Sequence, residues 1–218
     1  MKSFILSISL ICIGFAGFGQ DTKNSPNSFF GNTNLFRDVT FSNSIFEFGY
    51  LNSPVLGKNL SGFHFNFLAA FNQHFATGFG IDNLSTNTIT YPNYTSAINP
   101  QFSYTVFKWR NEILIAENHK IGISIPIDIG IGYASYSDDY FQTANNSRII
   151  ADDHFFSGTA GLNINMNLFK HMGLTVGGRY RISSGVIKVG TDNDYSNYVL
   201  NATIRFRIFK DEFKDKHK

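Results

Sequence analysis

The sequence has almost no cysteine, little charge and no second long hydrophobic run. Its one cysteine, Cys12, lies in an apolar N-terminal segment, so the rest of the chain can form neither a disulfide framework nor a thiolate metal site. Charged residues make up 16% of the chain, against about a quarter in an ordinary soluble domain. After residue 19, no apolar run approaches the roughly 18 residues that a membrane-spanning helix needs, which excludes a helical membrane protein.

The charged residues that are present point to no particular ligand. The net charge is +2, and the lysines and arginines are scattered rather than clustered. A nucleic-acid partner is therefore not predicted, because such partners require a basic patch or stripe. Six aspartates fall in the predicted connecting segments: Asp138, Asp139, Asp152, Asp153, Asp192 and Asp194. They could hold Ca²⁺ or Mg²⁺, but they follow no ordered ligand pattern. We expect solvated acids and predict no cofactor.

The N-terminus has the form of a secretory signal peptide. Lys2 precedes an apolar run from Phe4 to Phe18, which ends in the small-x-small pattern at residues 17–19. We therefore predict that residues 1–19 are removed. Residues 20–40 are rich in Asn, Ser and Thr and are predicted to be a mobile lead-in.

Alternation of apolar and polar residues dominates the segment from residue 41 to 209. A period of two indicates β-strands, most clearly from Ile121 to Tyr133. Eight strands are predicted, around Phe46, Phe48 and Tyr50; Phe63 to Phe71; Phe75 to Ile81; Phe102, Tyr104 and Val106; Ile121 to Tyr133; Leu162 to Leu168; Leu174 to Ile182; and Tyr198 to Ile208.

Two places depart from this alternation. In the first strand the apolar phase changes between Ile45 and Phe46, so we expect a β-bulge there. Residues 110–120 fit no strand phase and are predicted to be a turn, with a ninth and a tenth strand as the alternative.

The predicted connections alternate in length. Those at 72–74 and 169–172 are very short, and those at 52–61 and 110–120 are intermediate. The connections at 84–99, 135–155 and 183–196 are long. Short turns at one end and long loops at the other are typical of a transmembrane β-barrel with an even number of strands. The predicted fold is all-β: a closed antiparallel up-and-down barrel of eight strands over residues 41–209, followed by a charged periplasmic tail at 210–218.

A secreted lipocalin-like barrel has the same alternation, but its apolar face turns inward around a ligand. The other face of a soluble barrel should carry many Lys, Glu, Arg and Asp residues. Here that face carries small or neutral polar residues: Gly122, Ser124, Gly130, Gly132, Asn163, Asn165 and Asn167. Such residues suit a crowded lumen. A lipid-facing exterior also explains the phenylalanines and four predicted interfacial tyrosines, Tyr50, Tyr104, Tyr133 and Tyr198.

With its signal peptide, eight amphipathic strands and terminal strand Tyr198–Phe209, the chain resembles the OmpA-type and OmpX-type family of small outer-membrane barrels over nearly its whole length. The terminal strand resembles the family's assembly signal, although the charged segment 210–218 follows it. The resemblance implies location in the outer membrane of a Gram-negative bacterium and contact with outer-membrane lipid and lipopolysaccharide. It also implies insertion by the outer-membrane assembly machinery.

We expect a non-enzymatic protein with a structural or surface-interaction role through its long extracellular loops. Some small outer-membrane barrels resemble lipid A-modifying enzymes with a Ser and a His near one rim. His154 and Ser157, with Asp152 or Asp153, are the candidates for such a site. Residues 154 and 157 have opposite parity, so they should project to opposite faces of a strand. A lipid A-modifying enzyme and a secreted ligand-binding barrel remain the alternatives.

Four arginines have inward parity on the last two strands and need anions in a narrow lumen. Glu47 is the predicted partner of Arg205 and Arg207, near one end of the barrel. Asp128 lies at a depth comparable with Arg181 and His64, which suggests a second cluster. The predicted lumen charge cluster is Glu47, Asp128, Arg179, Arg181, Arg205 and Arg207. The alternative is that these arginines reach water at the two rims.

Overall fold

The computed structural model describes residues 41–71, 74–86, 100–117, 120–138 and 148–209. The predicted signal peptide, lead-in and charged tail lie outside this part of the chain. Within it, no helix is long and apolar enough to cross a membrane.

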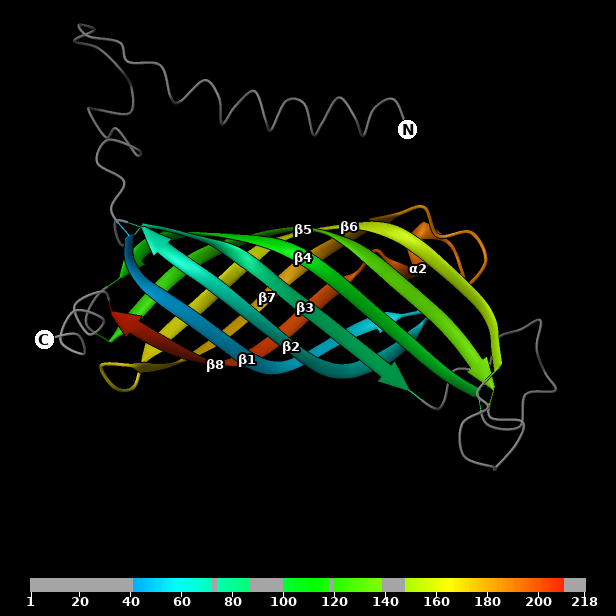
Figure 1. Ribbon diagram of the computed structural model, residues 1–218, viewed down its shortest axis with the longest axis horizontal. Coiled ribbons are helices and arrows are strands. Elements are labelled where there is room, and N and C mark those ends of the chain that lie inside the picture. Colours follow the sequence, from blue (N-terminus) through cyan, green and yellow to red (C-terminus); the bar gives the residue numbers. More distant parts are fainter. Residues whose placement is uncertain (1–40, 72–73, 87–99, 118–119, 139–147, 210–218) are drawn as a thin grey trace, which may run out of the picture. The chain divides into compact units, whose positions relative to one another are not determined.

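The described residues form a closed barrel in which every strand pairs antiparallel with its neighbours in the chain and the last strand pairs with the first (Figure 1). This confirms the predicted fold class. One short helix, α2 (Asp192–Tyr195), lies between the last two strands. The strands are β1 Phe41–Val55, β2 Lys58–Phe71, β3 Phe75–Thr86, β4 Pro100–Glu117, β5 Ile121–Asp138, β6 Arg148–Asn167, β7 Met172–Ser184 and β8 Tyr198–Phe209.

Short and long connections fall at opposite ends of the barrel. The turn end holds the connections 72–74, 118–120 and 168–171, and the loop end holds 56–57, 87–99, 139–147 and 185–197. The first connection is shorter than predicted. Leu56 and Gly57 have φ values of 52° and 71°, and positive φ at both positions is what the type I′ two-residue hairpin turn requires.

The prediction of a turn at residues 110–120 was wrong, because β4 continues to Glu117. Arg110 and Glu112 point inward and Ile113 outward, in the phase of the rest of the strand. The register with β5 then shifts between Leu114 and Ala116, which adds one residue to β4. This irregularity and the half-buried Leu114 concealed the alternation in the sequence.

The bulge expected next to Ile45 was also misplaced. Ile45 points inward and is buried with Leu68, Ala70 and Ala76 near the turn end. The phase of β1 is therefore continuous, and its register shift lies between Phe41 and Asn43. Because Ile45 is apolar and points into the lumen, the sequence wrongly suggested that the apolar phase changes at this residue.

Small residues on the inner wall make room for larger neighbours. A Cβ atom on Gly80 would lie 2.0 Å from Asn66 Oδ1, and one on Gly177 would lie 1.9 Å from Asn163 Oδ1. The lumen is filled in this way by side chains, as is usual for eight strands.

Candidate functional site: the filled lumen and its cap

The exterior of the barrel carries a band of exposed apolar side chains that includes all eight strands. We call it the apolar band. One representative from each strand, in order, is Phe48, Phe65, Phe79, Phe107, Ile129, Leu162, Val176 and Ile204. A soluble monomer rarely exposes a contiguous apolar patch larger than a few hundred Å². An apolar exterior around a polar interior is the arrangement of a membrane-spanning barrel.

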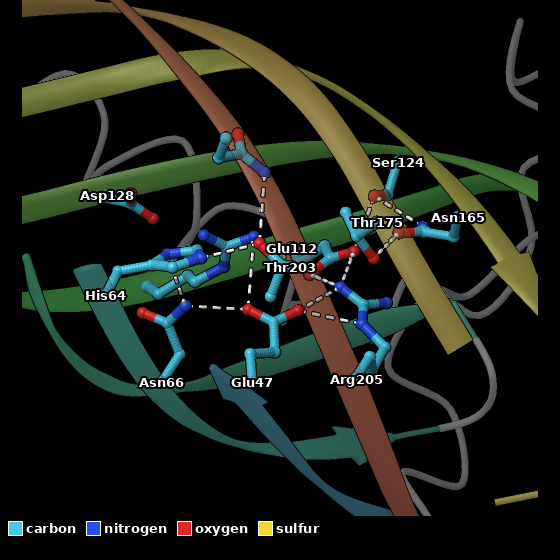
Figure 2. Close-up of polar contacts among 12 residues, drawn as sticks. Glu47, His64, Asn66, Glu112, Ser124, Asp128, Asn165, Thr175, Thr203 and Arg205 are labelled. Carbon is cyan, nitrogen blue, oxygen red and sulfur yellow. Dashed lines mark hydrogen bonds and ion pairs between the residues drawn. The ribbon is translucent and has the colours of Figure 1, made fainter. Parts of the chain in front are cut away.

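Inside the barrel, toward the turn end, two carboxylates and two guanidiniums form a buried charge quartet. Figure 2 labels three of its members, Glu47, Glu112 and Arg205. Arg205 Nε donates to Glu47 Oε1 at 2.8 Å, and Arg205 Nη2 donates to Glu112 Oε2 at 2.8 Å. Arg110 Nη2 lies 3.6 Å from Glu47 Oε2 and 3.5 Å from Glu112 Oε2. The quartet is electrically neutral, and each carboxylate contacts both cations.

Neutral side chains hold the two carboxylates in place. Asn66 Nδ2 donates to Glu47 Oε2 at 2.8 Å. Ser124 Oγ donates to Glu112 Oε1 at 2.6 Å. Ser124 in turn accepts a hydrogen bond from Asn165, which accepts one from Thr175 (Figure 2). Buried carboxylates are costly unless they are paired and hydrogen-bonded, and both conditions are met here.

A second charged cluster, of Asp82, Lys108, Asp128 and Arg179, adjoins the quartet on the side of the loop end. Lys108 Nζ lies 2.5 Å from Asp82 Oδ1 and 3.3 Å from Asp128 Oδ2. Arg179 Nη1 also donates to Asp128, and Thr159 Oγ1 donates to the same carboxylate at 3.0 Å. These two cations and two anions again balance, so ion pairs block the lumen at two levels.

Beyond the two charged levels, the strands reverse their polarity. On β4, Trp109 and Phe107 point outward and Lys108 inward, whereas farther toward the loop end Tyr104 points inward and Thr105 outward. The inward apolar residues form an outer core: Leu51, Val55, Leu60, Leu84, Phe102, Tyr104, Val106, Ala134, Tyr136, Phe155, Val186, Val189, Tyr195 and Val199. This part of the barrel has the polarity of a water-soluble barrel.

Arg181 belongs to the outer core rather than to either charged cluster. Its Nε donates to the Tyr195 carbonyl at 2.6 Å and its Nη2 donates to Ser53 Oγ at 3.1 Å. The guanidinium lies 4.7 Å from the centre of the Tyr104 ring. A cation over an aromatic face is attracted by the ring quadrupole, so Arg181 joins the connection 185–197 to the barrel wall.

The connection 185–197, which we call the cap, closes the loop end. Its Val186, Val189 and Tyr195 are part of the outer core. Asp153 Oδ2 accepts hydrogen bonds from the backbone N–H groups of residues 187, 188 and 189 at 3.2, 2.6 and 2.6 Å. Asp192 Oδ1 accepts two more, from the N–H groups of residues 185 and 186. The expectation of a solvated acid was therefore wrong for Asp153, which is buried, whereas Asp192 is half-exposed.

The chain is similar to solved structures of small outer-membrane barrels. Neisserial surface protein A has a TM-score of 0.51 and 10% sequence identity, with 79% of this chain and 100% of that chain covered. Ail, the attachment invasion locus protein of Yersinia pestis, has a TM-score of 0.49 and 16% identity, with 78% and 100% covered.

The fold is that of the small outer-membrane β-barrels. No protein-family model matches the sequence, and no curated protein matches it. The apolar band and the polar lumen agree with the fold, since closed barrels of this type belong to outer membranes.

The outer-membrane barrel brings together some of the residues predicted from the sequence and separates others. Glu47 contacts Arg205, and Asp128 contacts Arg179. Arg181 lies in the outer core, away from Asp128. The prediction for Arg207 places it with Glu47, whereas its backbone N–H donates to the His171 carbonyl at the turn end and its side chain is half-buried.

Four charged residues of the lumen were missed: Asp82, Lys108, Arg110 and Glu112. Two of them lie in the segment 110–117, which was predicted to be a turn. Lys108 was missed because Tyr104 and Val106 were assigned to the lipid-facing side, which gives position 108 the wrong face. Tyr104 was predicted to be interfacial but is buried in the lumen, with 1% of its surface exposed.

The candidates for a lipid A-modifying triad do not lie together. His154 points outward, 5.0 Å from Tyr133 between ring centres, whereas Ser157 points inward and is buried. Asp153 accepts the three bonds from the cap, and Asp152 lies 4.0 Å from Lys188. Within the described ranges, no group of three or more His, Cys, Asp or Glu side chains is arranged to hold a metal ion.

Proposed function

We propose that the protein is a closed, non-enzymatic component of the outer membrane, with a structural role and a surface-interaction role through its extracellular loops. The observation that supports this most strongly is the lumen, which is blocked by two charged clusters and by the capped outer core. A solute would have to separate ion pairs whose members are buried on all sides. Opening a path through either cluster would leave buried charges unpaired, at a cost of about 3–5 kcal/mol for each broken pair.

The lengths of three strands support the surface role. β4, β5 and β6 have 18, 18 and 20 residues, whereas about 9–11 residues suffice for a tilted strand to span a bilayer. These strands are therefore long enough to extend beyond the outer leaflet at the end where the connections 87–99 and 139–147 begin. We propose that partners bind at these connections, and that the assembly machinery recognises β8 during insertion.

The experiment that tests the closed barrel is conductance of the full chain in a planar bilayer. We expect no steady porin-sized conductance, and a shift in gel mobility on boiling in SDS as for a folded membrane barrel. Large and stable channels would refute the closed state. Replacing the connections 87–99 and 139–147 separately, with 56–57 left intact, should alter binding at the cell surface without changing heat-modifiable mobility. Unchanged binding for both replacements would refute the loop role.

The non-enzymatic part of the proposal has its own test. Lipid A extracted from cells that express the chain should have the same mass spectrum as lipid A from cells that express the His154→Ala variant. A modification that appears with the native chain and disappears in the variant would show enzymatic activity. Ser157→Ala serves as the matched second variant, because it lies on the opposite face of the same strand.

A further inference from the structure

Directly above the apolar band, a row of small polar side chains crosses five neighbouring strands on the outer wall. Each member is the direct cross-strand partner of the next. Partners in such a row have Cβ atoms about 4.5–5.5 Å apart. The row, which we call the outer belt, is Asn52, Ser61, Ser85, Ser103 and Ser135. All five side chains are exposed or half-exposed. A shorter row below it pairs Asn83 with Thr105.

The outer belt adjoins the edge of the apolar band. The hydroxyl of Tyr50, an exposed residue of that band, lies 2.5 Å from Ser61 Oγ. Exposed Tyr180 and Tyr198 occupy the same zone on β7 and β8, where the two are paired. Tyrosine is enriched at membrane–water interfaces because its ring is apolar and its hydroxyl is polar. The Asn52 end of the outer belt therefore lies at the level of the head groups of the outer leaflet. Because the strands of such barrels are tilted by about 35–45°, the row rises toward the loop end, and its Ser135 end lies farther out, where the sugars of a glycolipid extend.

The chemistry of the outer belt is that of hydroxyl and amide groups. Its five members carry no charge, whereas a surface that binds phosphate uses Arg or Lys. At the β6 end the belt meets Asp152, which is already paired with Lys188 at 4.0 Å. Hydroxyls both donate and accept hydrogen bonds, and amides supply two donors and an acceptor. This combination is complementary to the hydroxyl groups of sugars.

Bonds within the wall orient these side chains before any ligand arrives. Asn52 Nδ2 donates to Ser61 Oγ at 3.3 Å, and Asn83 Nδ2 donates to Thr105 Oγ1 at 2.9 Å. Both residues stand on rigid strands rather than on loops. Groups that are held in place before binding lose less conformational entropy when a ligand binds.

We propose that the outer belt is a seat for the carbohydrate head groups of outer-leaflet glycolipid, bound through hydroxyl and amide hydrogen bonds rather than through phosphate. The proposal rests on the outer-membrane location in the proposed function, but not on the closed lumen or on the loops. It makes the wall of the barrel, on the face of β1 to β5, the surface that contacts lipopolysaccharide sugars.

Single-cysteine labelling of the full mature chain tests this proposal, since Cys12 is the only native cysteine and lies in the predicted signal peptide. Ser103→Cys and Ser135→Cys report on the belt, and Ile129→Cys reports on the apolar band. Asn193→Cys reports on the cap, at an exposed position of the short helix α2. Each variant is placed in phospholipid vesicles, in vesicles with glycolipid that carries its core sugars, and in vesicles with lipid A alone. The rate of reaction with a membrane-impermeant maleimide is then measured.

In phospholipid, the two belt cysteines should react rapidly and the Ile129→Cys variant should not react. Core-bearing glycolipid should slow the belt cysteines several-fold, with Asn193→Cys little changed and lipid A alone having a smaller effect. Three outcomes would overturn the proposal. Protection already in phospholipid would place the belt in the membrane, and equal slowing at Asn193→Cys would indicate crowding only. Protection by lipid A equal to that by core-bearing glycolipid would show that the belt does not bind the core sugars.

A second measurement does not depend on labelling. The variant with Ser61, Ser85, Ser103 and Ser135 all changed to Ala should retain several-fold less core-bearing glycolipid through purification than the native chain. Its gel mobility before and after boiling in SDS should match the native pattern, which shows that the barrel has folded. Equal retention by a folded variant would overturn the seat. A porin-like conductance of the native chain would instead refute the closed barrel and leave this result intact.

Discussion

Removal of one member of the charge quartet should destabilise the barrel far more than removal of a surface charge. Arg205→Gln leaves Glu47 and Glu112 with Arg110 as their one shared cation, at 3.6 and 3.5 Å. A buried charge left without its partner costs about 3–5 kcal/mol. With a urea dependence of about 1–3 kcal/mol per M, the unfolding midpoint should fall by about 2 M.

The double variant measures the interaction between Glu47 and Arg205 separately from the effect of each substitution alone. When Glu47→Gln is combined with Arg205→Gln, the lumen retains Arg110 and Glu112, a neutral pair. The loss of unfolding free energy should therefore be smaller than the sum of the two single losses, by about 0.5–3 kcal/mol for groups in direct contact. The exposed pair provides the control, because Lys188→Gln should cost no more than about 1 kcal/mol.

The assay is urea unfolding in detergent micelles, followed by the fluorescence of Trp109. This residue is the single tryptophan of the chain and is exposed on the apolar band, so its emission changes when the wall leaves the micelle. Additive effects below about 1 kcal/mol would refute the reasoning, since they are typical of exposed pairs. They would mean that water reaches the quartet.

The remaining predictions use the same unfolding assay or hydrogen exchange. Gly80→Ala should cost about 1–3 kcal/mol through overpacking against the lumen, whereas Gly158→Ala, which has open space around the added carbon, should be nearly neutral; equal effects would show that the inner wall is loosely packed. Ile129→Arg should cost about 2–4 kcal/mol because it buries a charge in the apolar band, and a neutral effect would place this residue in water. Asp153→Ala should speed backbone exchange in the cap, whose N–H groups lose their acceptor, while Asp152→Ala should leave it unchanged; unaltered exchange in the first variant would show that the outer core alone holds the cap.

Alternation was sufficient to predict the barrel, since each of the eight strands has a stretch with a period of two. The lumen was harder to predict, because one strand carries opposite polarity in its two halves. In the half of β4 near the loop end, the apolar residues Phe102, Tyr104 and Val106 point inward. In the other half, the apolar residues Phe107 and Trp109 point outward. A prediction that assumes one apolar face along the whole length of each strand cannot detect this reversal. A change from Ser and Thr to Phe and Trp at the odd positions of β4 is the signal that could have shown it.

The two aspartates that hold the cap show a different limit. Asp153 and Asp192 lie in predicted connecting segments, where acids are usually solvated. Nothing in their sequence positions distinguishes them from Asp152. Their role follows from backbone N–H groups that meet them in three dimensions, 34 to 36 residues away for Asp153. Arg205 and Glu47 could be paired from the sequence because closure of the barrel fixes which strands are neighbours. No comparable rule places a loop against a strand.

The quartet also has a consequence for how accurately the barrel closes. Arg205 is separated from Glu47 by 158 residues and from Glu112 by 93, so its bonds form only when the last strand joins the first. A slip of one residue between β8 and β1 would turn Arg205 outward into lipid. A slip of two would place Thr203 or Arg207 beside the glutamates instead. Arg207 would also supply a guanidinium, so the buried charges discriminate against a slip of one and against the slip that brings Thr203. The charges that block the lumen thereby also favour the correct strand register when the barrel closes.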